Sequence, residues 1–485
     1  MIKFGTSGWR AVIGEEFNID NVRVVVSAIA NYVIKNHKSD KRVADKKSIP
    51  QVVIGYDTRF LSDKFARTAA EVLAGNNIKA LFCVRDVPTP VVGYEIVRRK
   101  IDGGINFTAS HNPSDYNGIK FSPSWGGPAL PEVTKEIENS CQKILSKRNG
   151  NGVKSMSWDE GLRERLIEEI DPRSVFLKRI EKFVDYDTIK KAKLRVGADF
   201  LYGTGRGYLD TALQDAGCKV HTLHFWRDVL FGGKTPEPSE ENLAELYELM
   251  KTEKCVIGLS VDGDADRFGI LDTDGTYIVP NQVLAVLLYF LKETRKWDGV
   301  VARTVMTSHF VDAVANKYGI PVRETPVGFK FIGEVMESEP MIIGGEESGG
   351  LTIKGHIPEK DGVLACLLMA ELRAWAKKPI TAVINELYKK VGYFYTDRIN
   401  FRLDSERVAK LSAKLKAAPP KEVLGIKVAK LNTMDGFKFI LTDGSWFGLR
   451  LSGTEPVVRY YIETNSAVKL KKLHVLGEHL VNCHW

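Results

Sequence analysis

One local plan occurs three times in this chain of 485 residues. An apolar strand enters a polar loop, a helix of about a dozen residues follows, and a turn leads into another strand. The three copies begin with strands predicted at 51–59, 194–199 and 299–303 and end with strands predicted at 77–84, 218–225 and 320–323. Each copy is a βαβ unit. The chain is therefore predicted to be an α/β protein.

The three copies are spaced too widely for a repeat array, whose units recur about every 20–50 residues. We therefore expect three related α/β domains. Polar or turn-rich segments suggest the boundaries, so that the predicted domains span 1–152, 153–276, 277–390 and 391–485. The last of these combines a helix at 405–418 with several strands, which predicts a smaller α+β domain.

The composition, with 44% hydrophobic and 27% charged residues, is that of a soluble globular protein. The longest apolar stretches, 283–291 and 363–370, fit buried helices rather than membrane spans. The first ten residues lack the pattern of a secretory signal, and the six cysteines form no Cys-x-x-Cys pair. We expect a reduced, cytoplasmic protein.

The formal net charge is +8, but the basic residues are dispersed along the chain. The densest run, 35–47, includes two aspartates and no aromatic residue, which is typical of a solvated loop. Positive clefts concentrate anions. We therefore expect a small anionic substrate and neither a nucleic-acid nor a membrane partner.

The segment Thr-Ala-Ser-His-Asn-Pro at 108–113 is the first candidate for chemistry. Ser110, exposed at the end of a short apolar strand, has His111 beside it and Lys120 ten residues later, as expected for a covalent nucleophile. The alternative is a serine that caps a helix or tightens a turn. Gly118, like the proline that ends the segment, is expected to keep the following residues from forming a regular element.

Three alternate aspartates, Asp262, Asp264 and Asp266, follow another apolar strand. A turning backbone would gather their carboxylates around one point, and such hard oxygen ligands favour Mg²⁺ or Ca²⁺ over zinc. An EF-hand is excluded, because its sixth position is Arg267 instead of Gly and its twelfth is Thr273 instead of Glu. We therefore predict a metal site at the end of this strand, where ligands bind in α/β folds.

Two further loops carry groups that suit a phosphorylated sugar. In the glycine-rich loop 344–350, the backbone can approach a ligand closely and carboxylates can accept hydrogen bonds from hydroxyls. Near the C-terminus, Arg450 and Arg459 flank a Ser-Gly-Thr segment whose hydroxyls and amides suit a phosphate dianion. Plain turns between strands are the alternative for both. The sequence contains no P-loop, H-E-x-x-H or G-x-S-x-G motif, and 203–207 lacks the spacing of a dinucleotide site.

Four of these signatures occur in one order: Thr-Ala-Ser-His-Asn-Pro from 108, Asp-Gly-Asp-Ala-Asp-Arg from 262, Gly-Glu-Glu-Ser-Gly-Gly from 345 and Arg-Leu-Ser-Gly-Thr-Glu-Pro from 450. Together they resemble the α-D-phosphohexomutase family, specifically its phosphoglucomutase/phosphomannomutase members, over essentially the whole chain. The resemblance implies three related α/β domains of mixed sheets with flanking helices. It also implies a C-terminal α+β domain related to the TATA-binding-protein fold, with all four domains around a central cleft.

The resemblance also implies a role for each candidate residue. Ser110 is expected to be a phosphoserine that donates and regains a phosphoryl group. Together with Ser110, three aspartates are expected to hold Mg²⁺: Asp262, Asp264 and Asp266. The residues expected to transfer protons or stabilise charge are Arg10, His111, Lys120 and Arg267. The residues expected to contact the sugar are Gly328, Lys330, Glu346 and Ser348. The residues expected to grip the phosphate that is not reacting are Arg450, Ser452, Gly453, Thr454 and Arg459.

Charge supports this assignment independently. Three aspartates and a phosphoserine sum to about −5, and Mg²⁺ leaves about −3, so a second phosphate needs cations such as Arg10, Lys120 and Arg267 nearby. A single serine and a single remote clamp imply that the sugar turns over midway as a bisphosphate. The expected reaction is the interconversion of glucose 1-phosphate and glucose 6-phosphate, with glucose 1,6-bisphosphate as intermediate and activator.

Alternatives to this reaction remain. Gly350 stands where many dual-specificity members have His, so mannose 6-phosphate, glucosamine 6-phosphate and pentose phosphates are also candidate substrates. A metal-dependent sugar-phosphate phosphatase would use the same acids, and a non-catalytic sugar-phosphate-binding protein is a third reading. The sequence is compatible with a monomer or a homodimer.

Overall fold

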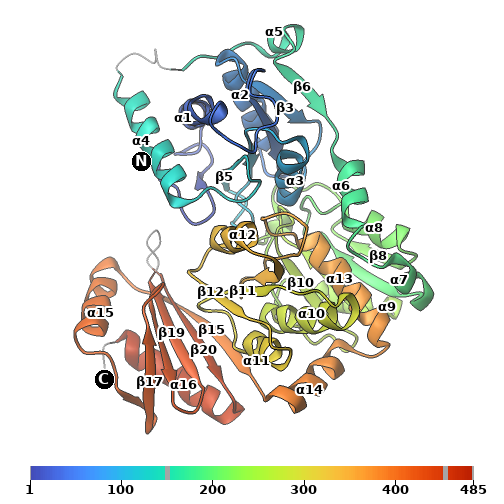
Figure 1. The fold of residues 1–485 in the computed structure, drawn as a ribbon, viewed down its shortest axis with the longest axis vertical. Coiled ribbons are helices and arrows are strands. Elements are labelled where there is room, and N and C mark those ends of the chain that lie inside the picture. Colours follow the sequence, from blue (N-terminus) through green and yellow to red (C-terminus); the bar gives the residue numbers. More distant parts are fainter. Residues whose placement is uncertain (1, 148–152, 452–456, 483–485) are drawn as a thin grey trace. The chain divides into compact units, whose positions relative to one another are not determined.

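The computed structural model describes residues 2–147, 153–451 and 457–482 (Figure 1). These residues form two compact units. The first unit comprises Met1–Pro280, Phe329–Glu339 and Ser348–Thr381, and the second comprises Asn281–Gly328, Pro340–Glu347 and Ala382–Trp485. The predicted boundary at 148–152 lies outside the described residues.

The first unit begins with a six-stranded mixed sheet in the order β1-β5-β4-β2-β3-β6. Its strands are β1 (Trp9–Val12), β2 (Gln51–Tyr56), β3 (Lys79–Cys83), β4 (Gly103–Phe107), β5 (Tyr116–Pro123) and β6 (Ile167–Ile170). The helices of this region are α1 (Ile19–His37), α2 (Ser62–Gly75), α3 (Thr89–Arg99), α4 (Pro131–Ser146) and α5 (Trp158–Arg163). Strand β2 is an almost continuous apolar run, and α2 and α3 both pack on it. It is buried, as its sequence predicted.

A second sheet of the same unit has the order β10-β9-β7-β8. Its strands are β7 (Arg195–Asp199), β8 (Lys219–Leu223), β9 (Ile257–Val261) and β10 (Phe268–Asp272). The nearby helical elements are α6 (Arg173–Ile180), α7 (Tyr186–Ala192), α8 (Leu209–Asp215), the 3₁₀ turn η1 (Phe231–Gly233) and α9 (Ala244–Glu253). β9 is parallel to β7 and antiparallel to β10, so the loop between β9 and β10 lies at the edge where β7 also ends.

Later parts of the chain complete the first unit. They contain α12 (Phe329–Ser338), β14 (Leu351–Ile353) and α13 (Gly362–Ala376). Asp361 caps the N-terminus of helix α13, and its side chain accepts a hydrogen bond from Leu364 N. Twelve of its 15 residues are buried, and it packs on β9 and β10. This confirms the prediction that the apolar run at 363–370 is a buried helix.

The second unit contains a parallel set of strands in the order β12-β11-β13. These strands are β11 (Val300–Thr304), β12 (Val322–Thr325) and β13 (Met341–Gly345). The helices are α10 (Pro280–Arg295), α11 (Phe310–Lys317) and α14 (Ile380–Val391), of which α10 and α14 begin at the boundary with the first unit. The apolar run 283–291 lies in α10, which is buried along most of its length, as predicted.

The C-terminal part of the second unit is an antiparallel sheet in the order β15-β20-β19-β18-β17-β16 (Figure 1). Its strands are β15 (Tyr395–Arg402), β16 (Glu422–Val423), β17 (Ile426–Asn432), β18 (Phe437–Leu441), β19 (Trp446–Leu451) and β20 (Val457–Thr464). Two helices, α15 (Ser405–Ala417) and α16 (Ala467–Val481), contribute leucines to one core with the apolar residues of the sheet. Mixed sheets with helices, followed by a C-terminal α+β domain, are the predicted fold class, which is confirmed.

One prediction about local structure is wrong. The residues after the Ser110 segment form the strand β5, which contains Gly118 and Lys120. Glycine is required here because β5 lies between β1 and β4: a Cβ atom on Gly118 would lie 2.6 Å from Thr108 O and 2.7 Å from Trp9 O. Gly118 therefore permits close packing of a central strand.

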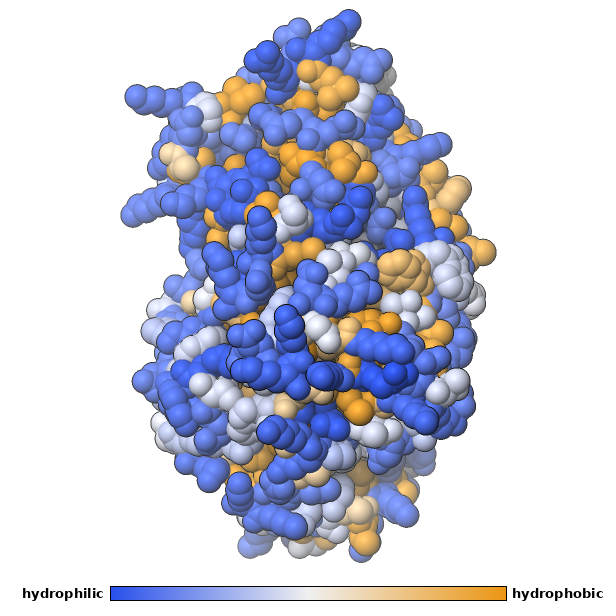
Figure 2. Space-filling view, turned by 90° about the vertical axis from the view of Figure 1, so that its right-hand side faces the viewer, coloured by the Kyte–Doolittle hydropathy of each residue, from blue (hydrophilic) through white to orange (hydrophobic). Residues whose placement is uncertain are grey.

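Within the described residues, no helix has both the length and the apolar character that a membrane span requires. On the face shown in Figure 2, hydrophobic residues lie in small groups among hydrophilic ones.

Candidate active site

Ser110 lies in the loop that follows β4, in the first unit. The sequence predicted an exposed serine, but this prediction is wrong, because Ser110 is only 1% exposed. The difference arises because Ser110 Oγ donates a hydrogen bond of 2.6 Å to Asp262 Oδ2, from the loop after β9. His111 Nδ1 lies 3.3 Å from Ser110 Oγ. The hydroxyl therefore faces the predicted metal ligands.

The backbone of Ser110 is in the left-handed region, with φ of 52°. For a residue with a side chain, this conformation costs about 1–2 kcal/mol, and such strain is often found at functional sites. The Ser110 amide is satisfied by Thr108 Oγ1 at 2.8 Å. Gly263 packs against the Ser110 carbonyl, since a Cβ at that position would lie 2.7 Å from Ser110 O. The loop is thus held by side-chain and close backbone contacts.

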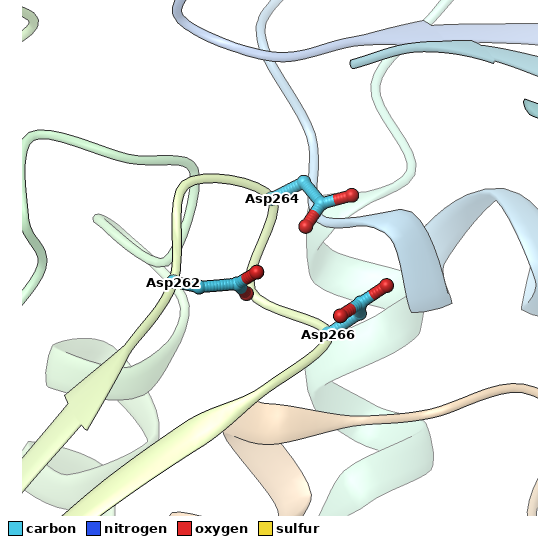
Figure 3. Close-up of side chains that lie close together, drawn as sticks. All are labelled: Asp262, Asp264 and Asp266. Carbon is cyan, nitrogen blue, oxygen red and sulfur yellow. The ribbon is translucent and has the colours of Figure 1, made fainter. Parts of the chain in front are cut away.

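The three predicted metal ligands converge (Figure 3). Asp262, Asp264 and Asp266 each offer a carboxylate oxygen, and these atoms lie within 4.8 Å of one another. All three residues are buried in the loop between β9 and β10. The loop turns through Ala265, whose φ is 54°, and the Arg267 amide donates a 3.0 Å hydrogen bond to Asp262 Oδ1. The backbone therefore turns as the alternate spacing predicted.

Two lysines balance this negative charge. Lys120, on β5, donates hydrogen bonds to Asp264 Oδ2 at 2.6 Å and to Asp266 Oδ2 at 2.7 Å. Lys360 Nζ lies 3.2 Å from Asp266 Oδ2. Thr89, the first residue of α3, donates to Asp264 Oδ2 at 2.6 Å. Each oxygen that faces Lys120 is therefore bound by at least two donors.

These contacts separate the pKa values of the three carboxyl groups. Burial, together with the charges of Asp264 and Asp266, raises the pKa of Asp262 well above its usual range. Burial is the largest influence on Asp264 and Asp266 and opposes their ionisation. The neighbouring donors together outweigh it and hold the pKa of both carboxyl groups below the ordinary value: Lys120 and Thr89 act on Asp264, and Lys120, Lys360 and Arg267 act on Asp266. The same pairing raises the pKa of Lys120 despite its burial. Lys120 is therefore a cation at neutral pH.

The carboxylate cluster fits a hard divalent cation. Asp264 Oδ1 and Asp266 Oδ1 are buried and have no hydrogen-bond partner. A buried acceptor without a partner is costly, and a cation would satisfy both oxygens. Oxygen-only ligands in this number suit Mg²⁺. The Ser110 hydroxyl, bonded to Asp262, is placed beside them.

The remaining predicted groups of this centre lie around Ser110. Arg10, on β1, donates a 2.6 Å hydrogen bond to Asn112 Oδ1. Arg267 Nε lies 4.0 Å from Asp266 Oδ1. Burial and the nearby cations Arg267 and Arg10 lower the pKa of His111 well below its ordinary value, so His111 is neutral at neutral pH. The structure therefore brings together all seven predicted catalytic and metal-binding residues, with Arg267 beside them.

The predicted sugar-binding residues are divided between the units: Gly328 and Glu346 lie in the second, Lys330 and Ser348 in the first. Gly328 N donates a 2.9 Å hydrogen bond to Glu346 Oε1. Lys330 is in the first turn of α12, and burial lowers its pKa. Ser348 is partly buried. The next residue, Gly349, accepts a backbone hydrogen bond from Phe268 N.

Two of the five predicted phosphate-binding residues are described. Arg450 and Arg459 are direct partners in the β19–β20 ladder. Arg450 Nε donates to Asp435 Oδ2 at 3.1 Å. Like charges directly opposite one another in a sheet are unfavourable unless an anion lies between them, which agrees with the predicted role. The other three predicted residues, Ser452, Gly453 and Thr454, lie outside the described residues.

Lys360 and Thr89 contact the cluster although no role was predicted for either. Lys360 lies shortly before α13, and Thr89 is the first residue of α3. Both are far in sequence from Asp266. The sequence around Lys360 offered a signal, because a lysine stands just before the Asp361 cap of an apolar helix. Thr89 offered none beyond a proline after it, which is typical of any helix start.

Four family descriptions match the chain. They are "Phosphoglucomutase/phosphomannomutase, alpha/beta/alpha domain I" over residues 1–148, "domain II" over 174–275, "domain III" over 279–391 and the "C-terminal domain" over 399–475. Among solved structures, a phosphoglucomutase/phosphomannomutase family protein from Burkholderia thailandensis superposes with a TM-score of 0.80 at 21% identity, covering 100% of this chain and 98% of that one. At this identity the likeness concerns the fold.

Relatives of similar length carry several names. A "Phosphoglucomutase/phosphomannomutase" from Thermococcus kodakarensis is 30% identical over 476 residues, covering 98% of this chain and 97% of that protein. A "Phosphoglucosamine/phosphogalactosamine mutase" from Sulfurisphaera tokodaii is 29% identical over 467 residues, covering 95% and 94%. Ser110 lies in the region that matches domain I, and the aspartate cluster lies in the region that matches domain II. The chain is therefore a member of the α-D-phosphohexomutase family of enzymes.

Proposed function

We propose that this enzyme is a phosphoglucomutase that interconverts glucose 1-phosphate and glucose 6-phosphate through a phosphorylated Ser110. One observation carries the proposal most strongly: Ser110 Oγ is hydrogen-bonded to Asp262 in a buried cluster of three carboxylates and two lysines. A serine that only tightened a turn would need neither the carboxylates nor the lysines.

In this proposal Mg²⁺ is held by Asp262, Asp264, Asp266 and an oxygen of the phosphorylated Ser110. When bound, the ion offsets negative charge on the phosphoryl oxygens. Lys120 and Lys360 already offset part of the charge of the aspartates, and Arg10 and Arg267, which lie nearby, are proposed to bind the incoming phosphate. Phosphoryl transfer needs such cations and correct placement more than covalent chemistry.

The transfer step assigns different roles to His111 and Lys120. A hydroxyl oxygen of the sugar phosphate forms a bond to phosphorus, and the bond between phosphorus and Ser110 Oγ breaks. The proton of the sugar hydroxyl must reach a base, and the departing Ser110 Oγ must gain a proton, which the same base can deliver. His111 is neutral and lies beside Ser110 Oγ, so it is the better acceptor, whereas Lys120 is protonated and stabilises charge. The product is glucose 1,6-bisphosphate.

Return of a phosphoryl group to Ser110 from the other end of the sugar requires the bisphosphate to turn over. Arg450, Ser452, Gly453, Thr454 and Arg459 are proposed to grip whichever phosphate is not reacting, and Gly328, Lys330, Glu346 and Ser348 are proposed to contact the sugar. The pairing of Arg450 with Arg459 in one ladder supports a phosphate site.

Glucose is proposed as the preferred substrate because the sugar loop has Glu-Glu-Ser at 346–348 and Gly-Phe-Lys at 328–330, which resemble the glucose enzymes of the family. The alternative is a phosphomannomutase or a dual-specificity enzyme. A metal-dependent phosphatase would use the same acids but release phosphate.

The test is to supply the 1-phosphates of glucose, mannose and glucosamine separately, with glucose 1,6-bisphosphate and Mg²⁺, and to follow products by ³¹P NMR. Glucose 6-phosphate should form fastest. Equal rates with mannose 1-phosphate would indicate dual specificity. Inorganic phosphate as the main product would replace the mutase by a phosphatase.

A further inference from the structure

Arg59 lies beside the Ser110 loop but has no part in the mechanism proposed above. It follows β2, which is parallel to β4, so the ends of both strands lie at one edge of the sheet. Arg59 is 0% exposed. Its charge is paired with Asp57, whose Oδ2 accepts from Arg59 Nε at 3.1 Å and whose Oδ1 accepts from Arg59 N at 3.0 Å.

The two other guanidinium nitrogens bind only main-chain oxygens of the segment that contains Ser110. Nη2 donates to Ser110 O and to Asn112 O, both at 2.7 Å. Nη1 donates to Pro113 O at 2.6 Å and to Tyr116 O at 3.0 Å. A guanidinium has five N–H donors, and with Nε on Asp57 all five have an acceptor.

The surroundings keep this fork in place. Phe231 lies over the guanidinium, with its ring centroid 5.0 Å from Arg59 Cζ. Arg227 Nη2 donates to Arg59 O at 3.4 Å. Ser62 Oγ donates to Asp57 Oδ1 at 2.8 Å, so the partner carboxylate is itself fixed. A side chain with this many fixed contacts has one conformation.

The contact with Ser110 O bears directly on the reacting atom. Ser110 has a left-handed backbone, and its backbone angles set where Cβ, and with it Oγ, lies relative to the carbonyl. The carbonyl oxygen accepts from Arg59 Nη2, and it lies so close to Gly263 that a Cβ there would be 2.7 Å away. Fixing the carbonyl therefore aims Oγ at Asp262.

We propose that Arg59, supported by Asp57, is a positioning residue that holds the Ser110 loop in the conformation required for phosphoryl transfer. This inference rests on the proposed function of Ser110. Lysine cannot replace Arg59, because it has three donors at one point and cannot reach four carbonyls spread over the loop. Loss of placement by about 1 Å is enough to reduce a rate by about 10²-fold.

The experiment compares the wild type with Arg59→Lys, Asp57→Asn and the control Arg303→Lys. Arg303 is also a buried arginine, 4% exposed, whose guanidinium is paired with Asp312 and Glu324, but it lies in the second unit. For each protein, hydrogen exchange of the peptide 107–118 is measured by mass spectrometry. The rate of phosphoryl transfer from glucose 1,6-bisphosphate to Ser110, kcat and KM are measured on the same samples, and thermal denaturation reports the folded fraction.

For Arg59→Lys we expect exchange of the loop amides to rise about tenfold and kcat to fall about 10²-fold, with KM changed less than about threefold. Asp57→Asn keeps the fork and should show the same pattern more weakly, which covers the case of an Arg59 variant that does not fold. Arg303→Lys should lower thermal stability without changing either loop exchange or kcat.

Unchanged loop exchange in the folded Arg59→Lys and Asp57→Asn proteins would overturn the positioning role. A loss of kcat no larger than that of Arg303→Lys at equal loss of stability would overturn its catalytic consequence. A wild type that transfers no phosphoryl group to Ser110 would instead refute the proposed function, and loop exchange would still decide whether Arg59 holds the loop.

Discussion

At the scale of single residues, the candidate site depends on close contacts that permit no extra atom. Gly263 is the clearest case, because it lies between two metal-site aspartates and packs on the Ser110 carbonyl. Ser110 in turn is in a strained conformation that its neighbours maintain. A change of one methyl group at Gly263 therefore tests the geometry without removing any polar group.

We predict that Gly263→Ala lowers kcat by at least about tenfold and stability by about 1–3 kcal/mol, the usual cost of overpacking. The methyl group would lie 2.7 Å from Ser110 O and would displace it. Steady-state kinetics and urea denaturation measure the two effects.

The control for this prediction is Gly319→Ala. Gly319 has a positive φ, of 64°, and a Cβ there meets no atom within 4 Å. The control should therefore lose about 1 kcal/mol of stability and no activity. Equal kcat for Gly263→Ala and the wild type would contradict the packing of Gly263 on Ser110.

At the scale of elements, the loop between β9 and β10 is the proposed metal site, and the proposed ligands are buried carboxylates. An ion that binds the folded state alone stabilises it, by about 2.7 kcal/mol at a hundredfold excess over Kd. We predict that Mg²⁺ raises the melting temperature of the wild type and that Asp264→Asn abolishes this shift. Differential scanning fluorimetry with and without Mg²⁺ is sufficient.

Asp272→Asn is the matched control for the metal. Asp272 is equally buried, but it accepts hydrogen bonds from Thr381 and from the Thr273 amide and is outside the cluster. It should lose stability yet keep the Mg²⁺ shift. An unchanged Mg²⁺ shift in Asp264→Asn would remove this loop as the metal site.

Strand β18 carries a buried lysine, Lys438, in the second unit. Its Nζ donates to Val305 O at 2.6 Å, lies 3.0 Å from His309 Nε2 and is 3.9 Å from the centroid of the Trp446 ring. Burial, with the nearby charge of Arg303, lowers the pKa of Lys438 to about 7. The group is thus packed largely as a neutral amine above neutral pH.

This pKa predicts an unusual dependence of stability on pH. Between pH 7 and the ordinary lysine pKa of 10.5, the unfolded chain binds a proton at Lys438 that the folded chain does not. Stability must therefore rise with pH, by about 1.4 kcal/mol per unit from this group. Urea denaturation at pH 7, 8 and 9 should show a steeper increase for the wild type than for Lys438→Met.

The exposed Lys416, on α15, supplies the control, and Lys416→Met should leave the slope unchanged. If Lys438→Met had the slope of the wild type, Lys438 would be protonated in the folded protein.

At the scale of the whole molecule, the family match over 279–391 does not coincide with a compact unit. Helix α13 falls within that match but packs on β9 and β10 of the first unit. Each large apolar side chain that loses its burial costs about 1.5–3 kcal/mol. The summed free-energy cost of exposing one side of α13 would therefore exceed the free energy of unfolding of a typical domain.

We therefore predict that a fragment of residues 279–391 does not fold cooperatively on its own, whereas the full chain does. Near-ultraviolet circular dichroism and dye binding would show lost tertiary packing and exposed apolar surface in the fragment. A sharp, native-like unfolding transition of the fragment would contradict the packing of α13.

The sequence predicted those parts of the fold that depend on local pattern. Strand β2, helix α2 and helix α15 lie where periodicity placed them, within a few residues. Strand β5 was missed because Gly118 resembles a chain breaker, and its function, close packing between β1 and β4, depends on strands far apart in sequence. The packing of α13 on β9 has the same cause.

The candidate site was predictable wherever its chemistry lies in one short motif. The aspartates of the β9–β10 loop converge as their spacing indicated. The burial of Ser110, the contact of Lys360 with Asp266 and the fork of Arg59 were not predictable, because each joins segments that only the folded chain brings together. Tertiary contacts, and not residue types, supply this information.

The most direct test of the central claim is the transfer of label from glucose 1,6-[³²P]bisphosphate to the protein in the presence of Mg²⁺. We predict that one phosphoryl group is transferred per chain, that peptide mapping places it on Ser110 and that added glucose 1-phosphate removes it as bisphosphate. Ser110→Ala should acquire no label. Label that persists in Ser110→Ala, or a wild type that turns over glucose 1-phosphate without ever becoming labelled, would contradict it.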